Sequence, residues 1–267
     1  MKSFAALLLL ALVPLQSDKD PARARLDKSP RHHEWVDVKN GERMVRCFVV
    51  FPEVKTKAAA VLVIHENKGL TDWVRSVADQ LAEAGYIAIA PDLLTGKGPE
   101  GGNTDAFKDV DSATQALYKL DPAQVTADLA AVADHVIKLP AADGKLSVAG
   151  FCWGGSQSFD FASRRKDLKA AFVFYGSAPK DESLFAKIEC PVYGFYGEND
   201  ARINATLPAT TEAMKKAGKV FEPITYTGAG HGFLRAGEAP DASEPNKKAR
   251  ADAWERWKKL LAPAPAK

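Results

Sequence analysis

The feature that most constrains the fold of this chain is the alternation of short apolar segments with segments of helical periodicity. Two of the apolar segments, Val-Leu-Val-Ile at 61–64 and Ile-Ala-Ile-Ala at 87–90, contain no polar residue at all. Strands of this composition are typical of parallel sheets that helices cover on both faces. The alternation therefore predicts an α/β fold, with a mostly parallel central sheet flanked by helices on both faces.

The same patterns place the individual elements. Strands are expected at residues 44–51, 59–64, 86–90, 146–149, 170–175, 192–196 and 221–226, and helices at 74–84, 125–137, 156–162, 207–217 and 243–261. Asp121 followed by Pro122 is a typical helix start, because the Asp side chain can cap the helix and proline pre-sets φ. The long connection 93–121, with one short helix, is expected either to border the pocket or to be a plain surface insertion.

The two ends of the chain are expected to lie outside the folded domain. Lys2 and the apolar run 4–13 predict a secretory signal peptide within residues 1–17, with an uncertain cleavage site. The run is too short to span a bilayer, and a buried N-terminal helix is the alternative. We expect an N-terminal arm at 18–43, poorly ordered over its first part, then a single domain at 44–261 and a frayed tail at 262–267. The protein is thus expected to be exported, to the periplasm or out of the cell.

Charge and cysteine content exclude several classes of function. The 36 basic and 34 acidic residues are scattered, whereas a nucleic-acid surface needs basic residues gathered on one patch. Three cysteines cannot build a disulfide framework, and no metal-ligand spacing is present. Cys47 and Cys190 are expected to be buried thiols, with a bridge between them as the weaker alternative. We expect neither a metal nor another cofactor.

The sharpest chemical signal is Gly-Phe-Cys-Trp-Gly-Gly at 150–155. A nucleophile flanked by glycines two residues away, between a strand and a helix, is the nucleophile elbow of α/β-hydrolases. The glycines leave room beside a tight turn, and the start of the next helix favours a thiolate. Cys152 is therefore the candidate nucleophile, and a buried structural cysteine is the alternative.

Candidate partners follow in the chain order that this fold uses, which is nucleophile, acid and histidine. Asp200 comes after the strand expected at 192–196, and His231 lies in a glycine-rich loop after the strand expected at 221–226. Glu198 could serve in place of Asp200. The sequence thus predicts a triad of Cys152, Asp200 and His231.

Together these motifs resemble the dienelactone hydrolase family. The resemblance rests on the elbow and on Tyr-Gly-Glu-Asn-Asp at 196–200, His-Gly-Phe at 231–233, His-Glu-Asn-Lys-Gly-Leu at 65–70 and Phe-Val-Phe-Tyr-Gly at 172–176. It implies an α/β-hydrolase fold and an enzyme that cleaves a small carboxylic ester or lactone through an acyl-thioester on Cys152. Such an enzyme is expected to act as a monomer, without nucleic acid and without stable membrane insertion.

The resemblance also implies roles for three residues around the nucleophile. Glu66 matches a glutamate that contacts the thiol in the family, and a surface carboxylate is the alternative. A carboxylate beside a thiol raises the thiol pKa, so Cys152 is expected to stay protonated until Glu66 accepts its proton or moves. The backbone amides of Asn67 and Trp153 are expected to form the oxyanion hole.

Arg235 matches an arginine that binds a substrate carboxylate in family members with acidic substrates, and a solvated arginine is the alternative. A second such arginine, expected before Tyr118, is missing, which favours neutral or monoanionic esters. Two other classes of function stay open at this point. One is a non-catalytic ligand-binding or thiol-sensing protein on the same scaffold, and the other is a cysteine peptidase.

Overall fold

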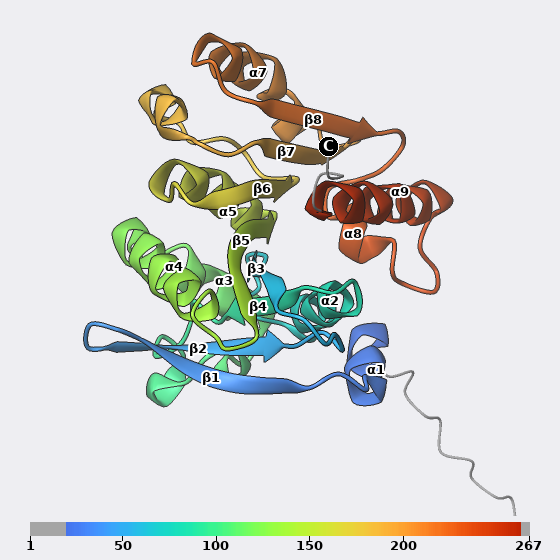
Figure 1. Ribbon diagram of the computed structural model, residues 1–267. Helices are drawn as coiled ribbons and strands as arrows, with labels where there is room; N and C mark the ends of the chain where they lie inside the picture. Colours follow the sequence, from blue (N-terminus) through green and yellow to red (C-terminus); the bar gives the residue numbers. More distant parts are fainter. Residues whose placement is uncertain (1–19, 263–267) are drawn as a thin grey trace, which may run out of the picture.

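The computed structural model describes residues 20–262, in which eight strands form one sheet in the order β1-β2-β4-β3-β5-β6-β7-β8 (Figure 1). The first two strands in this order pair antiparallel, as do β2 and β4, and every other pair is parallel. The mostly parallel sheet is therefore confirmed. The strands are β1 (His33–Asn40), β2 (Arg43–Val50), β3 (Ala58–Ile64), β4 (Ile87–Pro91), β5 (Ala142–Phe151), β6 (Leu168–Phe174), β7 (Val192–Gly197) and β8 (Phe221–Tyr226).

Helices cover both faces of the sheet, as expected (Figure 1). One face packs against α1 (Pro21–Lys28), α2 (Asp72–Glu83) and α9 (Glu244–Leu261), and the other against α4 (Pro122–Val136), α5 (Trp153–Arg164) and α7 (Leu207–Lys216). The connections contain the short helices α3 (Val110–Leu117), α6 (Ala201–Asn204) and α8 (Phe233–Ala236), and the 3₁₀ turns η1 (Pro99–Gly101), η2 (Thr104–Ala106) and η3 (Glu182–Lys187). All five expected helices are present, within a few residues of the expected bounds.

Aromatic side chains from three adjacent strands pack beneath α9. Phe174 lies between its neighbours, with ring centroids 5.0 Å from Phe151 and 4.3 Å from Phe195. Trp257 of α9 closes the cluster at 4.8 Å from Phe174. Phe151 directly precedes Cys152, so this cluster anchors the strand end from which the candidate nucleophile emerges.

The expectation of a poorly ordered first part of the arm is wrong for α1, and β1 in the later part of the arm was not expected as a strand. Asp20 caps α1 by accepting a hydrogen bond from the amide of Ala22 at 3.0 Å. Arg31 donates two hydrogen bonds, at 2.9 and 2.7 Å, to the buried carboxylate of Asp79 on α2. β1 pairs with β2 over eight residues. The residues that hold this charged segment in place are distant in the chain, so the composition of the segment does not reveal that it is ordered.

The connection 93–121 is tied to the body of the protein by Asp92. Its buried carboxylate accepts hydrogen bonds from the amide and the hydroxyl of Thr104, at 2.9 and 2.7 Å. On α3, the hydroxyl of Thr114 donates to the carbonyl of Asn67 at 3.0 Å. The connection therefore borders the loop after β3, where Glu66 and Asn67 lie.

Cys47 and Cys190 are buried free thiols, as expected, and the weaker alternative of a bridge between them is not the arrangement in the structure. No helix within residues 20–262 has the length and apolar character needed to cross a membrane. The expected signal peptide at 1–17 and all but the first residue of the expected tail lie outside the described residues.

Candidate active site

Cys152 occupies a sharp turn between β5 and α5. Its φ is +54° and its ψ is −114°, a conformation that costs a non-glycine residue about 1–3 kcal/mol. The turn is held by hydrogen bonds from the amide of Cys152 to Phe174 at 3.0 Å and from the amide of Ser156 to the carbonyl of Cys152 at 3.2 Å. Strained main chain at the end of a strand is the geometry of the expected elbow.

Close backbone packing explains the glycines on either side of Cys152. A Cβ atom on Gly150 would lie 1.9 Å from the carbonyl oxygen of Gly154. A Cβ atom on Gly154 would lie 2.3 Å from the carbonyl oxygen of His65. Neither position accepts a side chain without movement of the backbone, so α5 starts in direct contact with the end of β3.

The structure brings His231 and Asp200 together from the loops after β8 and β7. The Nδ1 atom of His231 lies 2.5 Å from Oδ2 of Asp200. Asp200 is buried, and the His231 side chain is 34% exposed, so the imidazole faces the solvent side of the pair. Glu198 instead accepts a hydrogen bond from the amide of Gly228 at 2.7 Å. Of the two candidate acids, Asp200 is therefore the one that contacts the histidine.

The pKa of His231 depends on Cys152 as well as on Asp200. The pKa of His231 is raised to about 9, and the largest cause is its hydrogen bond with Cys152. Burial opposes this rise, and the hydrogen bond with Asp200 adds to it. His231 thus lies close enough to both Cys152 and Asp200 for each of them to raise its pKa.

Glu66 is paired with Arg235, a contact that the sequence did not indicate. Nε of Arg235 donates to Oε2 of Glu66 at 2.8 Å. Glu66 is buried, whereas the Arg235 side chain is 40% exposed. Within the described part of the chain, no hydrogen bond joins Glu66 to Cys152 directly. The guanidinium offsets the charge of Glu66, which weakens the expected repulsion between this carboxylate and a thiolate.

Tyr175 is a site residue to which the sequence assigned no role, although it lies in the motif at 172–176. It follows β6 with a φ of +43°, and its ring packs edge-on against His231 with the centroids 5.1 Å apart. Its hydroxyl is buried and has no hydrogen-bond partner among the described residues. Burial raises its pKa most, Glu66 and Cys152 raise it further, and Arg235 lowers it. Tyr175 therefore lies amid the charged groups of the site.

The two expected oxyanion donors lie on facing segments. Trp153 is the first residue of α5, so no earlier helical carbonyl is available to its amide. Asn67 lies in the loop after β3, where Thr114 holds its carbonyl. Neither amide has an acceptor among residues 20–262. Both therefore remain candidates for the donors of an oxyanion hole.

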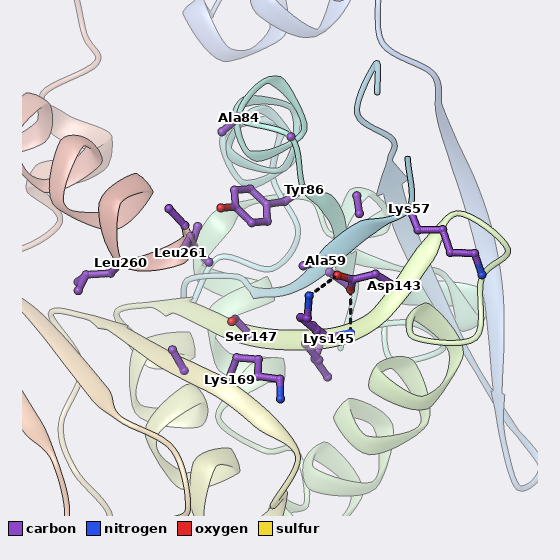
Figure 2. Close-up of a pocket in the computed structure, with 16 residues that line it drawn as sticks. Lys57, Ala59, Ala84, Tyr86, Asp143, Lys145, Ser147, Lys169, Leu260 and Leu261 are labelled. Carbon is purple, nitrogen blue, oxygen red and sulfur yellow. Dashed lines mark hydrogen bonds and ion pairs between the residues drawn. The ribbon is translucent and has the colours of Figure 1, made fainter. Parts of the chain in front are cut away.

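A cavity of about 530 Å³ lies elsewhere, at the amino ends of β3 and β5 (Figure 2). Tyr86, Ser147, Lys169 and Leu261 contribute to its wall, and no member of the expected triad does. Within residues 20–262, no three His, Cys, Asp or Glu side chains gather as possible metal ligands.

Comparisons with known proteins agree with this geometry. The model of the dienelactone hydrolase family matches residues 45–264. A Salmonella typhimurium protein named as a carboxymethylenebutenolidase is 32% identical over 73% of this chain and 74% of its own length. A Saccharolobus solfataricus protein of the same name is 30% identical over 81% of this chain and 93% of its own.

Solved structures show the same relationship. A Klebsiella pneumoniae protein described as a dienelactone hydrolase superposes with a TM-score of 0.77 at 25% identity. That match covers 88% of this chain and 99% of the Klebsiella chain. The chain therefore belongs to the dienelactone hydrolase family of the α/β-hydrolase superfamily, and it is a hydrolase of that kind.

Proposed function

We propose that this protein hydrolyses a carboxylic ester or lactone, with Cys152 as the nucleophile, His231 as the general acid and base, and Asp200 as the residue that orients His231. The observation that carries the proposal is the contact of His231 with Asp200 beside the strained elbow, where Cys152 is the first cause of the raised pKa of His231. An imidazolium hydrogen-bonded to the sulfur provides both the thiolate and the proton that a leaving alcohol needs.

The reaction has two steps in this arrangement. The Cys152 thiolate attacks the carbonyl carbon, and the carbonyl electron pair moves onto the oxygen, next to the amides of Asn67 and Trp153. Collapse of this intermediate expels the alkoxide, which takes the proton of the His231 imidazolium and leaves an acyl-thioester. Neutral His231 then accepts a proton from water, the hydroxide attacks the thioester, and the thiolate departs beside the renewed imidazolium.

Glu66 and Arg235 adapt the site to its substrate in this proposal. Glu66 governs the charge of the thiol, and Arg235 neutralises Glu66 in the structure described here. Only Nε of Arg235 is used in this pair, and the half-exposed guanidinium has further donors. A substrate carboxylate can therefore bind these further donors and share Arg235 with Glu66, which couples substrate binding to the charge near the thiol.

Replacement of the nucleophile tests the proposal. Cys152→Ala should reduce the hydrolysis of small activated esters and lactones by about 10³-fold or more, because members of a catalytic unit fail together. Cys190→Ala, which removes a buried thiol outside the site, is the matched control and should retain activity. Near wild-type turnover in Cys152→Ala would overturn the nucleophile assignment, and cleavage of peptides but not esters would favour a peptidase.

We also propose that residues 1–17 direct export, on the basis of Lys2 and the apolar run after it. Cell fractionation of the full chain and of a chain that begins at Asp18 would test this. Equal distribution of the two between fractions would overturn it.

A further inference from the structure

His65 connects the end of β3 to the candidate oxyanion hole. It is fully buried, and its Nδ1 atom lies 2.7 Å from the carbonyl oxygen of Glu66. Its Nε2 atom accepts a hydrogen bond from the amide of Leu93 at 3.3 Å. One ring nitrogen must donate and the other must accept, so this network assigns the neutral tautomer with the proton on Nδ1. Burial lowers the pKa of His65, which favours the same neutral state.

The carbonyl that His65 contacts belongs to the peptide group between Glu66 and Asn67. The other end of this planar group is the amide of Asn67, one of the two proposed oxyanion donors. A hydrogen bond to the carbonyl fixes the peptide plane and polarises the amide at its opposite end. Thr114 holds the next peptide group through the carbonyl of Asn67. Asn67 is therefore anchored on both sides while its amide stays free.

His65 also contacts the residue that supplies the second donor. Its ring stacks on the indole of Trp153, with the centroids 5.7 Å apart and the planes at 16°. Beside it, Gly154 packs against the His65 carbonyl so closely that only a hydrogen atom fits. One side chain thus contacts both segments that carry the proposed oxyanion donors.

We propose that His65 is a positioning residue that orients and polarises the Asn67 amide for the oxyanion. This inference rests on the proposed function, because it assumes that the Asn67 amide binds the reacting carbonyl oxygen. His65 itself touches no reacting atom. Negative charge develops on that oxygen only in the transition state, so His65 should influence kcat rather than KM.

The experiment compares His65→Phe with His65→Gln. Phenylalanine keeps an aromatic ring beside Trp153 but loses both hydrogen bonds, whereas glutamine can donate and accept. Loss of a whole oxyanion donor costs about 10²- to 10³-fold in kcat, so a misaligned donor should cost roughly 10- to 100-fold. We expect this loss in His65→Phe with KM nearly unchanged, and partial recovery in His65→Gln. His32→Phe is the control, because its side chain is 69% exposed and lies outside the site.

Two further readouts separate this role from a merely structural one. Alkylation of Cys152 by iodoacetamide forms no oxyanion, so its rate should be the same in His65→Phe as in the wild type. A thionoester presents sulfur, a weaker hydrogen-bond acceptor than oxygen, so its hydrolysis should fall less than that of the matching ester. If His65→Phe does not fold, His65→Asn allows the same comparison of ester with thionoester hydrolysis, because the shorter asparagine side chain cannot reach both hydrogen-bond partners.

Equal losses on the ester and the thionoester, or a parallel fall in alkylation, would overturn the proposal. Unchanged kcat in His65→Phe would do the same. These outcomes are distinct from failure of the proposed function, which would appear as turnover by Cys152→Ala.

Discussion

The two ends of β3 and β5 differ in what they offer a substrate. At their amino ends, a cavity of about 530 Å³ is lined by small apolar residues and by Tyr86, Ser147, Lys57 and Lys169 (Figure 2). At their carboxyl ends, the chain continues directly into Glu66 and into Cys152. There the charged groups contact one another, whereas among the described residues around the cavity only Lys145 and Asp143 form an ion pair, at 3.0 Å.

This difference shows that a hollow by itself is a poor guide to chemistry. The carboxyl end has a strained nucleophile, a histidine with a raised pKa and a buried hydroxyl without a partner. Strained main chain and an unpaired buried hydroxyl destabilise a fold, and such features, like shifted pKa values, cluster at functional sites. The amino end has none of the strained residues. In open α/β sheets, ligands bind outside the carboxyl ends of the strands.

The largest loss of activity from a change at the carboxyl ends of the strands is expected from Asp200→Asn. Loss of the carboxylate lets the imidazole adopt the wrong tautomer, and kcat should fall by about 10³- to 10⁴-fold. Asp200 also helps to raise the pKa of His231 to about 9. The imidazolium is present below this pKa and is lost above it, so the alkaline limb of the kcat/KM profile should lie near pH 9 in the wild type. In Asp200→Asn that limb should move to lower pH. An unmoved limb would mean that another group sets it.

An intermediate effect is expected from Arg235→Ala, and it depends on the substrate. A charge-assisted hydrogen bond to a carboxylate is worth about 2–3 kcal/mol, or roughly 30- to 150-fold in kcat/KM. An ester that bears a carboxylate should lose about this factor, and a neutral ester should lose much less. The ratio of mutant to wild-type kcat/KM for the two substrates cancels any general change in folding. Equal losses would assign Arg235 to the support of Glu66 alone.

The smallest effect is expected at the other end of the strands. Lys169→Ala and Ser147→Ala alter the cavity wall but touch no residue of the site, so kcat/KM should stay within about twofold of the wild type. Ester hydrolysis by both variants checks this. A loss as large as that in Arg235→Ala would break the distinction between the two ends of the sheet.

Most of the fold could be predicted from local sequence. Short β-rich segments marked seven of the eight strands, and the clearest of them, β3 and β4, are apolar throughout because both faces of the central sheet are covered. α1 and β1 were missed, because their order depends on the Arg31–Asp79 pair and on pairing with β2. Neither the ion pair nor the pairing with β2 produces a recognisable pattern in the sequence of this charged segment.

The candidate site divides in the same way. The sequence by itself determined the elbow and the order of Cys152, Asp200 and His231, because glycine spacing and strand ends are local properties of the chain. Only the tertiary structure decided that Arg235 pairs with Glu66, 169 residues away, and that His65 reaches both oxyanion segments. Those contacts join loops from different strands, and their geometry arises when the sheet places the loops side by side.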